Sequence, residues 1–500
     1  MTPIAEDIPG GLLRLLAYDS TSPLIFSSGL FLFLFAGFLF LYGLLRRATT
    51  ARILYVIAFS LYFYYKSSGL YFLLLIFAAA SDFLIARRLH RTECAAGRRW
   101  LVALSVAVNL GMLGYFKYTN FLIDIANDLF GEGFLEFRNI FLPVGISFFV
   151  FQSMSYTIDV YRRQLRPLDN WFDYLFYLSF FPQLVAGPIV RARDFLPQIR
   201  RNPVVVTREM FGTGVFLILT GLFKKAIVSD YISLNFVDRI FDEPLLYTGF
   251  ECLAGIYGYA LQIYCDFSGY SDMAIGIALL LGFRFPKNFD APYRSATITE
   301  FWRRWHISLS SWLRDYLYIS LGGNRKGRLR TYANLLLTML LGGLWHGAAI
   351  RFVLWGALHG AALALHKLWM SVVPGARATG AEMPPARRLV GTFLTFNLVC
   401  FGWLMFRAES MQTVQLMLHQ IFRNFNAPLI PQVLAGYAGV FTLLAAGYLL
   451  HLLPDRADAA ARRLVVRAPL AAQVAMAAVM IWCVMQVKSS DIQPFIYFQF

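Results

Sequence analysis

The sequence predicts an all-α, polytopic membrane protein, and its composition and its long apolar runs are the observations that predict this class. Of 500 residues, 58% are hydrophobic, 17% are aromatic and only 15% are charged, and the mean hydropathy is +0.56. Soluble globular chains contain about 45–50% apolar and about 25% charged residues. Only helices and closed barrels satisfy their backbone groups in lipid. The runs here are far longer than the ~10 alternating residues of a barrel strand, so helices are predicted.

Apolar runs of spanning or near-spanning length follow one another along almost the whole chain. They fall at 23–45, 53–65, 69–86, 100–117, 140–158, 172–190, 211–229, 250–282, 333–349, 351–372, 388–406, 432–453 and 469–487. A spanning helix needs ~20 residues, so the shorter runs are candidates for re-entrant segments. LPVGISF (142–148) and PQLVAGPIVR (182–191) are broken by Gly and Pro and are predicted to line an internal funnel. No linker separates soluble domains, so residues 1–500 are predicted to form one membrane domain.

The net charge of +16 comes from basic residues that cluster between the apolar runs, including Lys224 and Lys225. This distribution follows the positive-inside rule, which explains the charge better than nucleic-acid binding does. Basic residues at 46–52 follow the first run, and others at 456–467 precede the last one. Both termini are therefore predicted on the outer face, with the tail 488–500 emerging there and an odd number of crossings.

Sequence motifs of several common enzyme classes are absent. The chain contains no GxxxxGK[ST] loop, no HExxH pair and no GxSxG elbow, and its five cysteines form no CxxC. A serine hydrolase, a P-loop enzyme and a zinc site are therefore not supported, and no metal is expected.

The most polar interior stretch contains a histidine within an aromatic helical pattern. Residues 299–320 read TEFWRRWHISLSSWLRDYLYIS, and large apolar side chains recur there at helical spacing: Phe301, Trp305, Leu309, Trp312 and Tyr316. Aromatic residues beside arginines are typical of a helix at the membrane interface, so one such helix is predicted. His306 lies on it. An interfacial histidine without chemistry and a functional histidine fit this spacing equally well.

A second histidine ends the apolar run 333–349, in the sequence LGGLWHG. Ionisable groups in spanning segments are costly and indicate function by default, and an imidazole in an apolar wall can serve as a general base. His346 is therefore a candidate base, with a helix-end histidine bonded to a carbonyl as the alternative. His359 repeats the pattern in WGALHG. If 346–359 formed one helix, the two histidines would lie ~20 Å apart, so His359 is interpreted as packing.

Two carboxylates and the C-terminal tail are the remaining candidates for functional residues. Asp266 and Asp272 lie in the apolar segment YCDFSGYSDMAIG and are predicted to form ion pairs with arginines, orientation of a histidine being the alternative. The tail ends FIYFQF. It is either an aromatic belt or a terminus that presents the Tyr497 hydroxyl, which needs a base to act as a nucleophile.

These segments together resemble the membrane-bound O-acyltransferases of the alginate O-acetylase type. The resemblance is carried by FWRRWHISLSSWLRDYLYISLGGNRKG (301–327), LLGGLWHGA (340–348), YCDFSGYSDMAIG (264–276), FKYTNF (116–121), SYTIDVYR (155–162), LPVGISFF and PQLVAGPIVR, and it covers about 25–410. It implies a ring of transmembrane helices around a central funnel, a catalytic histidine at His346 and a second functional position at His306.

The resemblance also implies a reaction and its partners. The donor is a cytoplasmic acyl thioester, usually acetyl-CoA, with no tightly bound cofactor. The acyl group passes through the bacterial inner membrane to a periplasmic SGNH-esterase-type partner, which modifies an exported polysaccharide beside its export machinery. The last span and tail (469–500) carry F-x-Y-x-x-F, a motif of the broader group in which the tyrosine is proposed to carry the acyl group; here that residue is Tyr497.

Four basic residues are candidates for holding the CoA phosphates by charge, although the positive-inside rule explains them equally well: Arg303, Arg304, Arg325 and Lys326. In the predicted mechanism His346 removes a proton from an incoming hydroxyl, and His306 steadies the thioester or the developing oxyanion. Two alternatives stay open. One is a D-alanyl transferase fed by a carrier protein, and the other is a transporter or flippase that moves its cargo intact.

Overall fold

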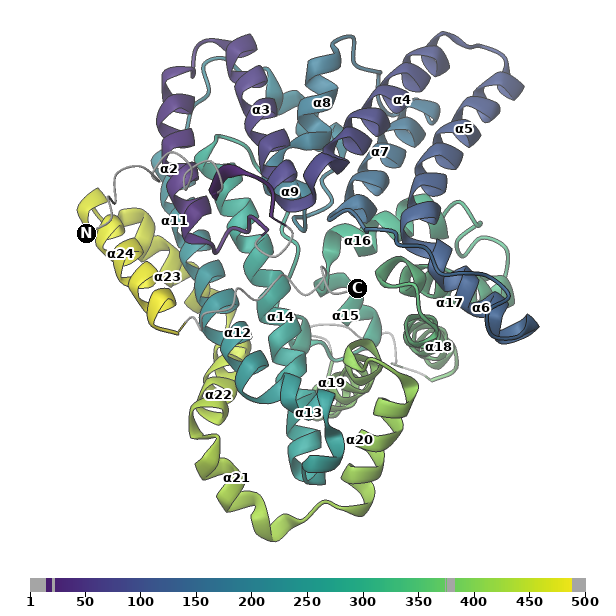
Figure 1. Cartoon of the computed structure of the whole chain (residues 1–500), viewed down its shortest axis with the longest axis vertical. Helices are drawn as coiled ribbons and strands as arrows, with labels where there is room; N and C mark the ends of the chain where they lie inside the picture. Colours follow the sequence, from purple (N-terminus) through teal and green to yellow (C-terminus); the bar gives the residue numbers. More distant parts are fainter. Residues whose placement is uncertain (1–14, 20–22, 374, 376–382, 488–500) are drawn as a thin grey trace, which may run out of the picture. The chain divides into compact units, whose positions relative to one another are not determined.

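The computed structural model describes residues 15–19, 23–373, 375 and 383–487, and every regular element in these ranges is a helix (Figure 1). This confirms the predicted all-α class. The chain divides into two compact units. Unit 1 contains the described residues up to Met210 together with Ile277–Phe285, and unit 2 contains Phe211–Gly276 and the described residues from Pro286 onward.

Unit 1 is built from helices that pack around aromatic side chains. Its helices are α2 (Gly29–Leu44), α3 (Thr49–Ser68), α4 (Phe72–Arg91), α5 (Ala95–Leu113), α6 (Thr119–Phe130), α7 (Ile146–Tyr161), α8 (Trp171–Ser179), α9 (Phe181–Leu184) and α10 (Ala192–Ile199). The ring of Phe181 lies 5.0 Å from Phe59 and 5.6 Å from Phe38, centroid to centroid. Its backbone N–H donates to the Ser60 hydroxyl at 3.2 Å, which satisfies a buried donor at the start of α9.

The two segments predicted to be broken are irregular in the structure and pack against each other. Gly145 adopts a left-handed conformation (φ 74°) immediately before α7, which glycine does without strain. A Cβ at Gly145 would come within 2.5 Å of the Leu184 carbonyl oxygen, at the end of the four-residue helix α9. Close backbone approach therefore explains the glycine, and the funnel that these segments were predicted to line stays a prediction.

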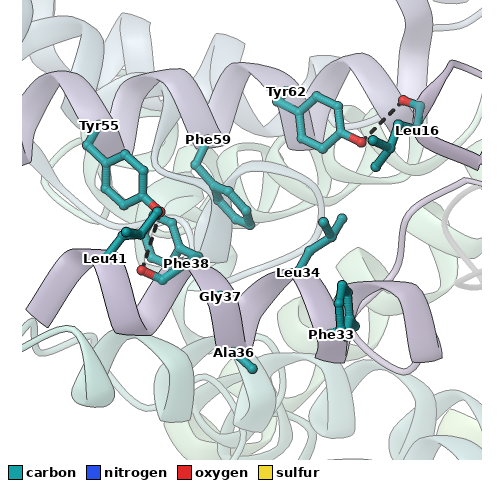
Figure 2. Close-up of a pocket in the computed structure, with 10 residues that line it drawn as sticks. All are labelled: Leu16, Phe33, Leu34, Ala36, Gly37, Phe38, Leu41, Tyr55, Phe59 and Tyr62. Atoms are coloured by element: carbon teal, nitrogen blue, oxygen red, sulfur yellow. Dashed lines mark hydrogen bonds between the residues drawn. The ribbon is translucent and has the colours of Figure 1, made fainter. Parts of the chain in front are cut away.

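Unit 1 also contains a cavity of about 520 Å³ between α2 and α3. Figure 2 shows its lining, which is made of aliphatic and aromatic side chains: Leu16, Phe33, Leu34, Ala36, Gly37, Phe38, Leu41, Tyr55, Phe59 and Tyr62. The two tyrosine hydroxyls donate to the Phe38 and Leu16 carbonyls, at 3.4 and 3.2 Å. Because its polar groups are already bonded and no charged side chain lines it, this cavity does not suit a charged thioester donor.

Unit 2 contains both histidine motifs identified in the sequence, and the regular elements of its described part are helices. Its α-helices are most of α11 (Arg208–Leu222) and α14 (Gly249–Leu280), α12 (Asp230–Ile232), α13 (Asp238–Asp242), α15 (Ile298–Arg304), α16 (Ile307–Trp312), α17 (Arg328–His346), α18 (Ile350–Val372), α19 (Pro385–Arg407), α20 (Met411–Arg423), α21 (Ile430–Gly436), α22 (Ala438–Leu452), α23 (Asp455–Arg467) and α24 (Leu470–Val487). Three π-helices join some of them: Phe223–Ser229, Ser233–Val237 and Leu313–Tyr318.

Four helical segments of the described chain are long and apolar enough to cross a membrane: Thr49–Arg91, Ala95–Phe130, Arg208–Asp242 and Pro385–Arg407. Two bent pairs raise the number to six if each pair forms one span. They are α21 with α22, bent by 91°, and α23 with α24, bent by 119°. Fewer helices than apolar runs meet both requirements, because several runs form shorter or interrupted helices and others, such as α14, α17 and α18, are long enough but not apolar enough. The position of the tail 488–500 lies outside the described residues.

The single interfacial helix predicted over 299–320 is wrong in two respects. The chain forms α15 and α16 with a break at His306, whose φ is 43°. The aromatic stripe is also inside the protein, since Phe301, Trp305 and Leu309 are each 1% exposed. A start signal was missed as well: Thr297 caps α15 by accepting from the Glu300 N–H at 3.1 Å, the S/T-x-x-E spacing of a capping box.

Candidate functional site

Helices α17 and α18 form a hairpin that presents His346 at its turn. α17 ends at His346 and α18 begins four residues later, and the two helices run side by side (Figure 1). Glycines allow this contact: a Cβ at Gly343 would meet the Phe352 carbonyl oxygen, and a Cβ at Gly360 would lie 2.9 Å from the Leu336 Cα. Small residues at helix interfaces of membrane proteins permit such approach. The assumption of one continuous helix over 346–359 was therefore wrong.

The imidazole of His346 lies among three aromatic rings. It is 4% exposed and makes edge-on contacts with Trp345, Trp355 and Phe406, with centroid distances of 5.0, 5.1 and 5.3 Å. His359 contacts the same indole of Trp355 at 4.7 Å. The hairpin thus brings His346 and His359 to one aromatic cluster instead of separating them by ~20 Å along a helix.

His306 is fully buried, and its hydrogen bonds define its protonation state. The side-chain oxygen of Asn288 accepts from the Ser308 backbone N–H at 3.2 Å, and the amide nitrogen of Asn288 donates to the Ser271 hydroxyl at 3.1 Å. The orientation of the Asn288 amide is thereby fixed. His306 Nδ1 lies 3.2 Å from the same oxygen and must donate to it, so Nε2 carries the lone pair. Burial lowers the pKa of His306 to about 3, which keeps the ring neutral near pH 7.

The two histidines of the sequence motifs share one neighbour. The Trp345 ring lies 6.3 Å from the His306 ring and 5.0 Å from the His346 ring. The structure therefore brings together both histidines predicted from the sequence. Sequence reasoning did not identify Asn288, Trp355 or Phe406 as part of this cluster. A tryptophan directly before each histidine, in WRRWH and LWH, was the available signal for the aromatic surroundings.

The predicted phosphate-binding residues differ in their surroundings. Arg304 forms ion pairs with Glu300 at 2.9 Å and with Asp290 at 3.5 Å, and it also donates to the Asp290 backbone oxygen. Its charge is therefore already compensated within the protein. Three others are exposed: Arg303, Arg325 and Lys326. Tyr497, the predicted acyl carrier, lies outside the described residues.

The carboxylates of the 264–276 segment form ion pairs, as predicted, but with lysines. Asp266 pairs with Lys225 at 2.6 Å, and Asp272 pairs with Lys224 at 2.6 Å. The placement of these lysines in a basic loop was wrong, since both lie in the π-helix Phe223–Ser229 inside a candidate span. Ammonium groups at that depth need carboxylate partners, which α14 supplies. No group of three or more His, Cys, Asp or Glu side chains suited to a metal occurs among the described residues.

Comparison with known proteins gives a family and several relatives. The model of the MBOAT, membrane-bound O-acyltransferase family matches residues 137–433. The chain is 42% identical over 410 residues to a probable alginate O-acetylase, AlgI of Pseudomonas aeruginosa, with 80% of this chain and 75% of that protein covered. It is 35% identical to the peptidoglycan O-acetyltransferase of Helicobacter pylori, with 78% of each chain covered. It is 28% identical to the teichoic acid D-alanyltransferase of Bacillus subtilis, over 54% of this chain and 70% of that protein.

Proposed function

Because the chain belongs to the membrane-bound O-acyltransferase family and is a multi-pass O-acyltransferase, we propose that it transfers acetyl groups from a cytoplasmic thioester toward an exported polysaccharide. The observation that carries this proposal is the buried aromatic cluster in which His306 and His346 share Trp345. A cluster with two imidazoles suits acid–base chemistry.

In the proposed reaction His346 is the general base. Its imidazole takes the proton of an incoming hydroxyl, whose oxygen attacks the carbonyl carbon of the acyl thioester. The carbon–sulfur bond then breaks, and the departing thiolate receives the proton from the imidazolium, so the histidine returns to its neutral state. A positioned general base contributes ~10²–10⁴-fold to rate.

The hydrogen bonds of His306 refine its part in this proposal. A developing oxyanion needs a hydrogen-bond donor, but the tautomer held by Asn288 offers an acceptor at Nε2. The expected oxyanion contact would require protonation, which burial opposes. We therefore propose that His306 steadies the thioester donor by accepting a hydrogen bond at Nε2, while the proton of the incoming hydroxyl goes to His346.

The finer steps of the proposal concern the donor, the partner and the orientation. Acetyl-CoA is the proposed donor, and the exposed Arg303, Arg325 and Lys326 are its proposed phosphate contacts. Tyr497 is the proposed hydroxyl that receives the acyl group and passes it to a periplasmic SGNH-esterase-type partner. Both termini would then face the periplasm of a bacterial inner membrane, and the polymer is an exported polysaccharide related to those of the relatives.

The test of the catalytic proposal is His346→Ala, measured as acetyl ester content of the polymer in cells with equal protein level. We expect a loss of at least a hundredfold. The control is His419→Ala, which removes an exposed imidazole of α20 and should leave acetylation unchanged. Equal acetylation in both variants would remove the catalytic assignment.

A second measurement distinguishes the two donor classes and tests whether the tail carries the acyl group. Purified protein in nanodiscs is supplied with radiolabelled acetyl-CoA or with an acylated carrier protein, the donor class suggested by the weaker likeness to a D-alanyltransferase. Label transfer from acetyl-CoA alone supports the acetyl proposal. Tyr497→Phe should abolish covalent labelling of the chain, and undiminished labelling would show that this hydroxyl does not carry the acyl group.

A further inference from the structure

Three buried rings near His346 carry nitrogen atoms without hydrogen-bond partners. The ring of His359 lies 4.7 Å from Trp355 and 5.2 Å from Trp302, centroid to centroid, and the two indoles lie 5.7 Å apart. Both ring nitrogens of His359 and the indole nitrogens of Trp302 and Trp355 make no hydrogen bond within the described residues. Trp355 and His359 are 1% and 0% exposed, so bulk solvent does not satisfy these atoms either.

Side chains that only fill space do not account for this pattern. Buried donors without a partner are costly and rare in native proteins, and a phenylalanine ring would fill similar space without that cost. A neighbouring indole shows the ordinary arrangement: Trp403 stacks 6.1 Å from Trp355, and its N–H donates to the Tyr293 hydroxyl at 3.2 Å. The interpretation of His359 as packing therefore leaves its two nitrogens unexplained.

Two of these nitrogens face one place beside α19. A Cβ added at Gly402 would lie 2.9 Å from His359 Nε2 and 3.4 Å from Trp355 Nε1. Because residue 402 is glycine, it has no side chain that would cover these two atoms. Phe406 follows Gly402 by one turn of α19, and its ring contacts His346 at 5.3 Å. The two nitrogens thus face a place about one helical pitch, ~5.4 Å, from the residue that contacts His346.

The chemistry of the two nitrogens suits a carbonyl oxygen. An indole N–H can only donate, and a neutral imidazole donates from one of its nitrogens. Two N–H groups that face one place can hold an oxygen acceptor, and in a buried apolar cluster they attract developing negative charge more strongly than in water. The proposed acyl transfer needs such donors, because Nε2 of His306 is an acceptor.

We propose that the Trp355 indole N–H and the His359 Nε2–H hold the carbonyl oxygen of the acyl thioester, an inference that rests on the proposed acyl transfer. When the hydroxyl oxygen attacks, one electron pair of the carbonyl double bond moves to this oxygen. Both N–H groups then stabilise the oxyanion and keep their protons. The electron pair returns as the carbon–sulfur bond breaks, and the proton passes from the hydroxyl through His346 to the departing thiolate.

The first test is the release of CoA from acetyl-CoA by purified protein in nanodiscs. Trp355→Phe and His359→Phe keep an aromatic ring and remove one donor each, so kcat should fall at least a hundredfold while KM for acetyl-CoA changes much less. His359→Gln restores an N–H and should recover most of the loss. The matched control is Trp403→Phe, which removes an indole N–H that already has Tyr293 as its partner and should leave kcat nearly unchanged.

Equal losses of kcat in Trp355→Phe, His359→Phe and Trp403→Phe would show that these rings only pack, and would overturn the proposal. If Trp355→Phe does not fold, the two variants of His359 still decide, since equal kcat in His359→Phe and His359→Gln refutes the donor role.

The second test is the infrared stretch of the carbonyl group of ¹³C-labelled acetyl-CoA bound to His346→Ala, which cannot complete the transfer. Donated hydrogen bonds weaken a C=O bond, so the frequency should rise when Trp355→Phe is added and stay the same when Trp403→Phe is added. An equal frequency in all three chains refutes this inference and leaves the proposed donor standing. Failure of acetyl-CoA to bind any of them refutes the proposed donor, and this inference with it.

Discussion

Removing the Lys225 ammonium is expected to destabilise the protein strongly, because it lies between two carboxylates in the interior of unit 2. Lys225 contacts Asp266 at 2.6 Å and Asp230 at 2.8 Å, and the side chains of Lys225 and Asp266 are only 4% and 2% exposed. Breaking a buried ion pair by removing one partner costs ~3–5 kcal/mol, since the remaining charge is left uncompensated. Lys225→Met removes the charge, keeps most of the side-chain volume and leaves two carboxylates facing each other.

The assay is the free energy of unfolding, obtained by titration with sodium dodecyl sulfate in mixed micelles. The control is Lys287→Met, which breaks a pair with Asp290 of similar length (2.5 Å) whose lysine is 67% exposed; such pairs contribute ~0.2–1 kcal/mol. Adding Asp266→Asn to Lys225→Met should recover ~1–3 kcal/mol, because the stranded charge is neutralised. The reasoning is refuted if the two single lysine variants lose equal free energy of unfolding. It is also refuted if the double variant has a lower free energy of unfolding than Lys225→Met.

Three further predictions concern the helical hairpin and His306. Gly343→Ala should cost ~1–3 kcal/mol in unfolding titrations, because its Cβ would meet the Phe352 backbone oxygen, whereas Gly342→Ala faces only a movable side-chain methyl and should cost less. Asn288→Ala should lower turnover at least tenfold, with recovery in Asn288→Asp, because the buried donors of His306 and Ser308 lose their acceptor. Lowering the pH from 7 to 5 should lower the free energy of unfolding by ~2 kcal/mol through His306, because the imidazole is protonated below about pH 6.5 in the unfolded chain but stays neutral down to about pH 3 in the folded protein. Unfolding titrations at both pH values should show that His306→Gln lacks this pH-dependent loss.

Element type and position were largely predictable from this sequence, because hydrophobic runs in a membrane protein are long and carry few charges. The run at 388–406 corresponds to α19 and the run at 351–372 to α18, each within a few residues. The breaks at 142–148 and 182–191 were also predictable, since Gly and Pro interrupt a helix by known steric rules. Which of these helices cross the membrane was less predictable: Pro469 marks the break between α23 and α24, but it does not give the 119° angle that the two helices form there.

The site was predictable as a pair of motifs but not as an arrangement. His306 and His346 were identified from their neighbours in sequence, while the proximity of His346 to His359 was missed. The glycines that bring α17 and α18 together lie in the motifs LGGLWHG and WGALHG, yet the turn between His346 and Ile350 contains no Pro or Asn that would have predicted it. An uninterrupted helix and a tight hairpin therefore give the same apolar pattern, and only the three-dimensional contact distinguishes them.

The break at His306 illustrates why local periodicity failed where the chemistry is concentrated. Residues 299–320 have an unbroken helical stripe, and one helix would satisfy their own backbone groups. Asn288, eighteen residues before His306, offers alternative acceptors for two backbone N–H groups. Its backbone oxygen accepts from the Ile307 N–H at 2.8 Å, and its side-chain oxygen accepts from the Ser308 N–H at 3.2 Å. Those bonds replace helical ones and hold His306 in a left-handed conformation of φ 43°. A non-glycine residue in that region is strained, and such strain is retained where the surrounding contacts fix it. The same contacts set the tautomer of the ring, so the departure from helical geometry and the chemical state of His306 have one cause.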